Sequence, residues 1–252
     1  MTLAISSRPP HRVFPNLTAD ARAQVLSRIY EGLNAEEMLA EALRGDLRGR
    51  IAMVSSFGAE SVALLHLVAK IDRATPVLFI DTQFLFPETL TYQAEVAHSL
   101  GLSDIRIIRA AFSDVRANDP DGALHLRDTD ACCTLRKTRP LEAALRDFDG
   151  WITGRKRFQS GERALLPRFE TDAAGRLKLN PLADWQPNDV QSYIELHGLP
   201  RHPLVARGYP SIGCAPCTSP VAAGEDPRSG RWRGKAKTEC GIHIVDGKII
   251  RG

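Results

Sequence analysis

The chain has 252 residues with 33 basic and 30 acidic side chains, so its formal net charge is only +3. That balance excludes the strongly basic surface typical of proteins that coat nucleic acid, and we expect no nucleic-acid partner. Apolar residues make up 43% of the chain, but no apolar run approaches the roughly 20 residues of a membrane span. We therefore expect a globular cytoplasmic protein without membrane attachment.

The chain is predicted to begin with an arm and two helices. Residues 1–17 hold three prolines and show little periodicity, so we expect a loose N-terminal arm. Apolar spacing predicts a helix over about 19–31. Asn34 and Glu37 match a capping box that starts a second helix, and Gly45 ends it.

Short apolar strands then alternate with amphipathic helices, which is the rhythm of a parallel sheet. The predicted strands are Ile51–Ser55, Val77–Ile80, Asp104–Ile108 and Trp151–Thr153, and the predicted helices run through His66, over Pro87–Leu100 and over Leu135–Arg146. Residues 165–179 predict a hairpin, and residues 188–197 predict a further helix. The expected fold class is α/β, a mostly parallel sheet with helices on both faces.

A turn of small residues, 55–61, leads from the first strand into a helix. Such turns hold backbone amides against phosphate, although small residues there also serve packing alone. The turn lacks both the P-loop pattern and the dinucleotide glycine pattern. Asp81 and Thr82 end the second strand at the same sheet edge, where open α/β sheets bind ligands. Together these features favour a phosphate-bearing ligand at this edge.

Four of the five cysteines form two pairs about eighty positions apart, Cys132 with Cys133 and Cys214 with Cys217. Cytosolic thiols stay reduced and an odd count leaves one unpaired, so a disulfide framework is not expected. Adjacent cysteines cannot form the knuckle usual for structural zinc, whereas a multi-iron cluster offers separate iron corners. This geometry and the resemblance described below favour a [4Fe–4S] cluster. The alternatives are zinc, buried small cysteines and a redox pair at 214–217.

The fifth cysteine, Cys240, follows a run of basic residues near the end of the chain. This run is Arg228, Arg231, Arg233, Lys235 and Lys237, with no acidic residue between them. A thiol is a nucleophile only as its thiolate, and neighbouring cations lower its pKa. Cys240 is therefore the candidate nucleophile, with an incidental surface cysteine as the alternative. The basic run is either an anion site or a solvated loop.

Taken together, these motifs closely resemble those of the iron–sulfur adenylyl-sulfate reductases, relatives of the phosphoadenylyl-sulfate reductases with an adenine nucleotide α-hydrolase-like fold. The resemblance covers nearly all of 54–243 and rests on residues 56–60, 81–82, 86–89, 132–133, 136–137, 159–160, 180–182, 211–220, 224–226 and 237–243. There are three departures from the family pattern. Gln83 replaces a usual glycine, Lys156-Arg157 replaces paired arginines, and Ile242 replaces a leucine.

The resemblance implies reduction of adenylyl sulfate to sulfite and AMP in sulfate assimilation and cysteine biosynthesis. It implies that Cys240 attacks sulfur and that thioredoxin, or a similar thiol donor, resolves the sulfonated cysteine. The implied ligands of the [4Fe–4S] cluster are Cys132, Cys133, Cys214 and Cys217. The implied substrate contacts are Ser56, Gly58, Lys137, Arg157, Arg228, Arg231 and His243. Arg157 is preferred to Lys156 because lysine lacks the bidentate fork of arginine.

We expect residues 1–220 to form the nucleotide-binding reductase domain with the cluster, and residues 221–252 to form a mobile tail carrying Cys240. A hinge around 221–234 would bring Cys240 to substrate and then expose it. Because the other four cysteines are assigned to the cluster, the reductant has to come from outside. The resemblance also implies a homo-oligomer.

Three other functions stay open at this point. The first is a phosphoadenylyl-sulfate reductase, or an enzyme of dual specificity. The second is an adenylating enzyme that thiolates RNA, although Phe57 and Ala59 interrupt the loop it needs. The third is a zinc-stabilised binding module, which would be colourless where an iron–sulfur protein is brown.

Overall fold

The computed structural model describes residues 17–45, 47–159, 161–235, 237, 241 and 242. The predicted arm, apart from Leu17, and the end of the predicted tail lie outside the described residues. Cys240 and His243 are among the residues that are not described.

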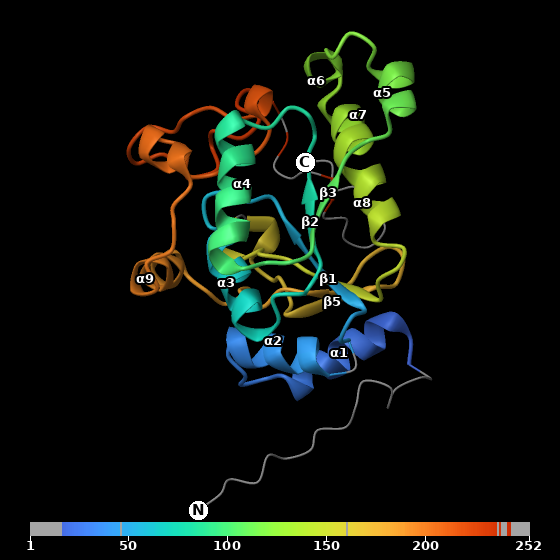
Figure 1. Cartoon of the computed structure of the whole chain (residues 1–252), viewed down its shortest axis with the longest axis vertical. Coiled ribbons are helices and arrows are strands. Elements are labelled where there is room, and N and C mark those ends of the chain that lie inside the picture. Colours follow the sequence, from blue (N-terminus) through green and yellow to red (C-terminus); the bar gives the residue numbers. More distant parts are fainter. Residues whose placement is uncertain (1–16, 46, 160, 236, 238–240, 243–252) are drawn as a thin grey trace, which may run out of the picture.

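Within the described residues, six strands form one sheet in the order β3-β2-β1-β4-β6-β5 (Figure 1). The strands are β1 (Ile51–Ser55), β2 (Val77–Ile80), β3 (Ile105–Ile108), β4 (Gly150–Ile152), β5 (Phe169–Thr171) and β6 (Leu177–Leu179). All neighbouring pairs are parallel except β5 and β6, which form the predicted hairpin. The mostly parallel sheet is thereby confirmed.

The helices of the described chain are α1 (Ala19–Ile29), α2 (Ala35–Arg44), α3 (Ser61–Ile71), α4 (Pro87–Leu100), α5 (Phe112–Asn118), α6 (Leu124–Arg127), α7 (Thr129–Cys133), α8 (Arg139–Ala144) and α9 (Pro187–Leu196). The predicted capping box is present, because Asn34 Oδ1 accepts from Glu37 N–H at 3.0 Å and Glu37 Oε2 accepts from Asn34 N–H at 2.8 Å. In the described part of the chain, no helix combines the length and hydropathy needed to cross a bilayer.

The predicted start of the helix over Leu135–Arg146 is wrong, because the chain is already helical from Thr129, where α7 begins. A π turn, Thr134–Thr138, follows α7 directly, and α8 begins only at Arg139. A π turn adds a residue to the hydrogen-bonded loop and so redirects the side chains that follow. The turn lies directly after Cys132 and Cys133, at a place where the sequence predicts a metal centre.

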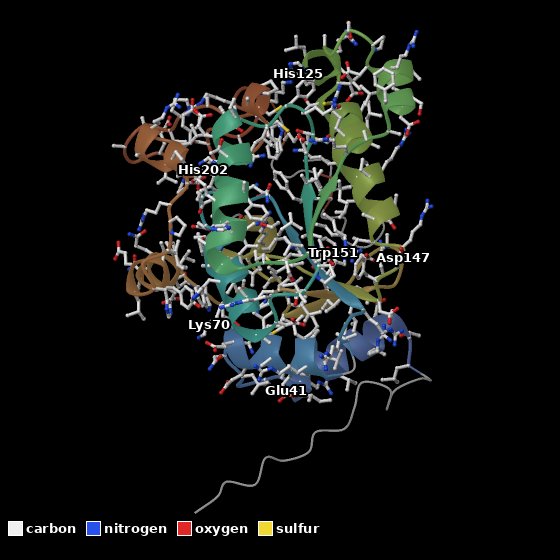
Figure 2. The ribbon with its side chains drawn as sticks, viewed as in Figure 1. Glu41, Lys70, His125, Asp147, Trp151 and His202 are labelled. Atoms are coloured by element: carbon white, nitrogen blue, oxygen red, sulfur yellow. The ribbon has the colours of Figure 1, made fainter. Side chains whose placement is uncertain are left out.

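Helices cover both faces of the sheet, as predicted. Met53 and Phe79 point to a large core shared with α1, α2, α3, α4 and α9. Their chain neighbours Ala52 and Leu78 point to a smaller core shared with α8. Trp151, buried in this smaller core, lies near the centre of the molecule (Figure 2).

The chain reverses its direction across the sheet at β1. It proceeds from β1 to β2 and β3 on one side and then returns to β4 on the other side of β1. Helices that connect parallel strands in opposite directions leave a crevice at the carboxyl ends of the two central strands. The fold therefore places a ligand site beyond β1 and β4.

Candidate active site

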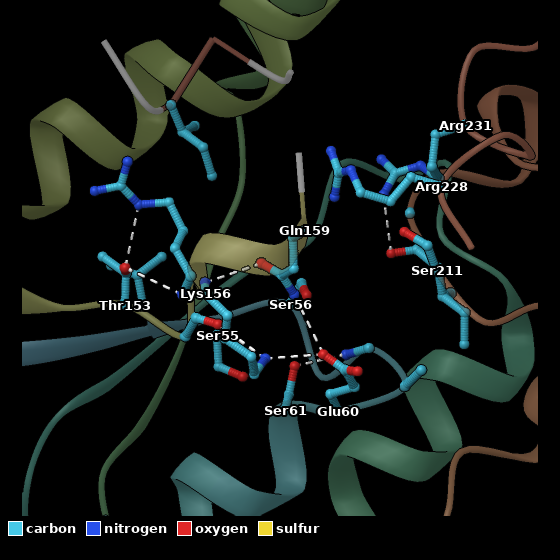
Figure 3. A pocket seen from close by; sticks show the side chains of 18 of the residues that line it. Ser55, Ser56, Glu60, Ser61, Thr153, Lys156, Gln159, Ser211, Arg228 and Arg231 are labelled. Atoms are coloured by element: carbon cyan, nitrogen blue, oxygen red, sulfur yellow. Dashed lines mark hydrogen bonds and ion pairs between the residues drawn. The ribbon is translucent and has the colours of Figure 1, made fainter. Parts of the chain in front are cut away.

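A cavity of ≈ 280 Å³ lies at this switch point. Its walls include Ser56 and Gly58 after β1, Thr82 after β2, and Thr153 and Lys156 after β4. Figure 3 shows Ser56, Thr153 and Lys156 approaching one another from the segments after β1 and β4. The expectation that the turn after β1 and the end of β2 share one sheet edge is confirmed.

The turn after β1 contains a buried aromatic residue with an unusual backbone conformation. Phe57 has a left-handed φ of 47°, and its ring packs edge-on against Phe79 at 5.3 Å between centroids. Ser61 Oγ accepts the Gly58 N–H at 3.0 Å, and a Cβ on Gly58 would lie 3.3 Å from Ser56 Oγ. Bulky residues rarely adopt this φ, and such strain clusters at functional sites. The turn thus presents the amino end of α3 to the cavity, where an anion is favoured.

Cations line the same cavity. Lys137 comes from the π turn, and Arg228 and Arg231 come from the C-terminal segment (Figure 3). Gly213 makes room for Arg231, because a Cβ there would overlap the guanidinium. The structure therefore brings Ser56, Gly58, Lys137, Arg228 and Arg231, five of the seven predicted contact residues, to one cavity.

Arg157 does not join them. Its Nε donates to Leu166 O at 2.9 Å, its guanidinium pairs with Asp184, and it lines a different, shallow cavity beside α1. The remaining predicted contact, His243, lies outside the described residues.

Lys156 faces the cavity in place of Arg157. Its ammonium donates to Glu60 Oε2 at 2.8 Å and to Gly154 O at 3.1 Å. Burial lowers the pKa of Lys156, and the Glu60 carboxylate opposes that shift. Gln159 donates to the same Glu60 oxygen at 3.2 Å. Glu60 and Gln159 belong to segments that carry the family resemblance, but their residue types alone gave no reason to assign them a role.

The four paired cysteines line a second, smaller cavity together. Cys132 and Cys133 end α7, while Cys214 is held by a β-bridge to Leu85. Thr82 Oγ1 lies 3.2 Å from Cys214 Sγ. The structure thus confirms that two segments far apart in sequence bring their thiols to one place.

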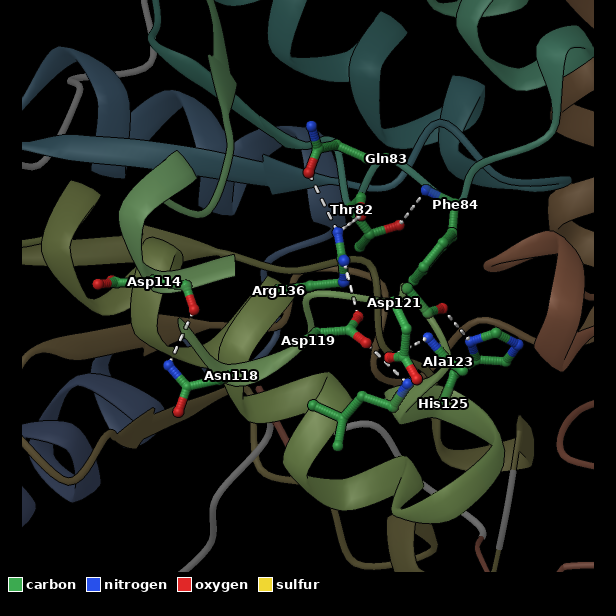
Figure 4. Close-up of polar contacts among 12 residues, drawn as sticks. Thr82, Gln83, Phe84, Asp114, Asn118, Asp119, Asp121, Ala123, His125 and Arg136 are labelled. Atoms are coloured by element: carbon green, nitrogen blue, oxygen red, sulfur yellow. Dashed lines mark hydrogen bonds and ion pairs between the residues drawn. The ribbon is translucent and has the colours of Figure 1, made fainter. Parts of the chain in front are cut away.

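A buried arginine, Arg136, lines the cysteine cavity. Arg136 donates to Asp119 at 2.8 Å, and to Thr82 O and Gln83 Oε1 at 3.1 Å each (Figure 4). Gln83, at the position of the family's usual glycine, has a left-handed φ of 65°. Burial, together with the neighbouring cysteines, raises the pKa of Cys132 to about 11, and Arg136 opposes that shift.

The two cavities share a wall. Thr82, Lys137 and Cys214 line both of them. Charge on one side of this wall therefore acts on groups on the other side across a short, largely solvent-free distance. In the described part of the chain, no three His, Cys, Asp or Glu side chains meet closely enough to hold a single metal ion.

Residues on both sides of Cys240 lie near the cavity. Lys237 pairs with Asp130 and lies over the Trp232 ring, with Nζ 5.6 Å from the centroid. Ile242 lines the cavity and packs on the smaller core. The hinge expected around 221–234 stays a prediction. In the structure, part of this segment pairs with 218–220, including a β-bridge between Thr218 and Arg231.

Comparisons with known proteins agree with this fold. The profile of the phosphoadenosine phosphosulfate reductase domain matches residues 50–220. The chain is 49% identical to the adenosine 5'-phosphosulfate reductase of Mesorhizobium japonicum, over 89% of this chain and 88% of that protein. It is 43% identical to the phosphoadenosine 5'-phosphosulfate reductase of Gloeobacter violaceus, over 86% and 92% of the two chains.

Solved structures also agree with this fold. The phosphoadenylyl-sulfate (PAPS) reductase of Candida auris, in a phosphate complex, superposes with a TM-score of 0.67 at 25% identity. That match covers 79% of this chain and 96% of the other. An FMN adenylyltransferase of Candida glabrata, 16% identical with a TM-score of 0.55, shares the fold and covers 81% and 75% of the two chains. The fold class is confirmed, and the chain belongs to the phosphoadenosine phosphosulfate reductase family.

Proposed function

We propose that this protein reduces adenylyl sulfate to sulfite and AMP, with Cys240 as the nucleophile, in cytoplasmic sulfate assimilation for cysteine biosynthesis. The observation that carries this proposal is the cavity at the switch point. One wall is a phosphate-binding type of turn, and other walls carry Lys137, Arg228 and Arg231. The relative from Mesorhizobium japonicum, named for the same reaction, supports it.

The walls of the cavity suit an adenylyl sulfate whose phosphosulfate faces the cations. Ser56 and Gly58 hold the nucleotide at the amino end of α3, where the helix dipole favours a phosphate. Lys137, Arg228 and Arg231, with His243, offset the repulsion between an attacking thiolate and an anionic sulfonate. Lys156 takes the place that we expected for Arg157, because it is Lys156 that faces the cavity.

The chemistry divides into two displacements. The Cys240 thiolate attacks the sulfate sulfur, an S–S bond forms, and the S–O bond to AMP breaks with its electrons leaving on AMP. One thiolate of a dithiol protein then attacks Cys240 Sγ and expels sulfite, and its second thiolate releases Cys240. The dithiol becomes a disulfide, sulfate sulfur gains two electrons, and two protons are released.

We further propose that Cys132, Cys133, Cys214 and Cys217 hold a [4Fe–4S] cluster. Four soft thiol donors line one cavity, and burial raises the pKa of Cys132 and Cys217 there, so a compensating positive charge is needed to hold their thiolates. Adjacent cysteines such as Cys132 and Cys133 cannot form the knuckle usual for structural zinc, which favours separate iron corners over zinc. Such a cluster would anchor the two cysteine segments to each other and would place charge beside Lys137. Redox cycling of the iron observed during turnover would contradict this structural and electrostatic role of the cluster.

The test is Cys240→Ser in anaerobically purified protein. We expect a brown protein with unchanged iron content and AMP affinity, no sulfite, and no sulfonated protein by mass spectrometry. Sulfite production at the parental rate would remove Cys240 from the mechanism. The parental protein provides the control, since it should gain one sulfonate when mixed with substrate in the absence of thiols.

A second candidate substrate is phosphoadenylyl sulfate. The relative from Gloeobacter violaceus and the Candida auris structure are both named for that substrate. Competition kinetics with the two nucleotides decides between them. We expect adenylyl sulfate to have the higher kcat/KM.

A further inference from the structure

Helices α5 and α6 turn apolar side chains outward. Neither helix contains a buried residue, while Phe112 is 78% exposed and Leu126 is 70% exposed. Figure 1 shows both helices at one end of the molecule, where α6 packs on α7 and α5 packs on the π turn that follows α7. Short helices in water depend on packing of an apolar face, so a pair with no buried side chains suits contact with another molecule.

Charged groups on this segment are largely used within it. Arg127 donates to both carboxylate oxygens of Asp121, at 2.6 and 2.9 Å. Asp128 accepts from Ala131 N–H at 2.8 Å, and Asn118 donates to Asp114 O at 2.8 Å (Figure 4). A partner would therefore find apolar contacts here, ringed by satisfied polar groups, which is the usual anatomy of an interface.

The segment leading to Cys240 is attached to α6 and to the following helix, α7. Lys235 Nζ donates to His125 O at 2.9 Å and to Thr129 Oγ1 at 2.6 Å, and these two residues flank Leu126 in sequence. Two residues further on, Lys237 pairs with Asp130 of α7. The apolar surface and the attachment of the segment before Cys240 thus meet at α6.

We propose that Phe112 and Leu126, the α5–α6 surface, dock the dithiol protein that releases sulfite from Cys240. The proposal rests on the proposed function, in which an external dithiol supplies the two electrons. A donor protein has to hold its thiolate against Cys240 Sγ for the displacement. A donor seated on the α5–α6 surface lies beside the attachment of the segment that carries this sulfur, so docking and delivery of the thiolate occur together.

The experiment compares Leu126→Glu with Leu196→Glu in the cluster-loaded protein. Leu196 is 79% exposed on α9, away from α6 in Figure 1, so the control introduces the same charge at an equally exposed leucine. We expect Leu126→Glu to raise the KM for thioredoxin about tenfold, the loss typical of one important interface side chain. Sulfite production with dithiothreitol and the single-turnover release of AMP should match the parental protein, and Leu196→Glu should leave all three unchanged.

Each outcome has a distinct meaning. An unchanged KM for thioredoxin in Leu126→Glu, and in Phe112→Glu as a second variant, overturns the docking surface. An equal rise in the KM for thioredoxin in Leu126→Glu and in Leu196→Glu also overturns the docking surface. A change of sedimentation coefficient in Leu126→Glu assigns this surface to contacts between copies of the chain instead. Absence of sulfite from the parental protein with dithiothreitol contradicts the proposed function itself.

Discussion

The ammonium nitrogen of Lys156 lies 2.8 Å from Glu60 Oε2, and only the glutamate reaches solvent. The Lys156 side chain is 3% exposed and the Glu60 side chain is 33% exposed. An ion pair with one partner fully buried is costly to break from the exposed side, because the buried charge is then left without compensation. This relationship makes Glu60 a structural support of the cavity wall.

Glu60→Gln should therefore destabilise the protein strongly. The neutral amide still accepts a hydrogen bond but removes the charge opposite Lys156, and we expect the free energy of unfolding to fall by about 3 kcal/mol. Urea denaturation at neutral pH measures this loss. The matched control is Glu88→Gln, at a carboxylate about as exposed as that of Glu60 but paired with Arg207, whose side chain is 61% exposed. That substitution should change the stability by less than about 1 kcal/mol.

A double variant separates the ion pair from other effects of Glu60. Glu60→Gln with Lys156→Met leaves no buried charge, so it should recover most of the lost stability. Equal instability in the single and double variants would contradict the interpretation that the unpaired Lys156 is responsible.

Substitution of Cys214 should affect both cavities at once. Cys214→Ser removes a soft ligand, so we expect loss of the brown colour and of most bound iron. Because Cys214 also lines the nucleotide cavity, AMP affinity should fall in the same variant. Iron analysis and calorimetric titration with AMP measure the two effects. Cys240→Ser is the control, and a Cys214→Ser protein with its full iron content would contradict the proposed ligand set.

Stability should fall in mild acid because of His202. This imidazole is buried between α4 and the C-terminal segment (Figure 2), accepts the Leu204 N–H at 3.2 Å and contacts Thr89 Oγ1 at 3.0 Å. Both ring nitrogens are thus satisfied by the neutral form, and burial lowers the pKa of His202 to about 4 from an ordinary value of 6.5. Below pH 6.5 the unfolded chain binds a proton that the folded chain does not. The free energy of unfolding should therefore drop by about 3 kcal/mol as the pH falls from 6.5 to 4.

His202→Asn isolates this contribution. Asparagine keeps an acceptor for the Leu204 N–H but does not titrate, so the variant should be less stable at pH 7.5 and should show a shallower loss in acid. Urea denaturation at half-unit steps of pH gives both slopes. Parallel stability curves for the parental protein and the variant would show that other groups cause the acid sensitivity.

The sequence-based predictions of secondary structure succeeded where residues within the element itself mark its bounds. Strand β1 and helix α4 have the predicted bounds because an apolar run and Pro87 mark their ends. Helices α5 and α6 were not predicted, since neither buries a side chain and so neither needs a periodic apolar face. The π turn was missed because it interrupts a helical pattern without changing the residue types.

The cysteine set was predictable because thiol chemistry is carried by residue type alone. The choice between Lys156 and Arg157 was not, because adjacent side chains point in different directions and the direction depends on tertiary packing. Arg157 is drawn away by Asp184 and by Leu166 O, neither of which a motif reveals.

Two single variants, Arg157→Ala and Arg231→Ala, test whether Arg157 lies outside the substrate cavity. Arg231→Ala removes a cation from the cavity wall, so we expect a loss of substrate affinity of roughly tenfold to a hundredfold, the value of one or two charged hydrogen bonds. Arg157→Ala breaks only the contacts to Asp184 and Leu166, so it should lower the free energy of unfolding slightly and leave the substrate affinity unchanged. Equilibrium binding of adenylyl sulfate to the Cys240→Ser background measures affinity without turnover. Arg157→Ala could weaken binding as much as Arg231→Ala only if Arg157 leaves Asp184 and enters the cavity when substrate binds. That result would contradict the choice of Lys156 over Arg157 as the substrate contact.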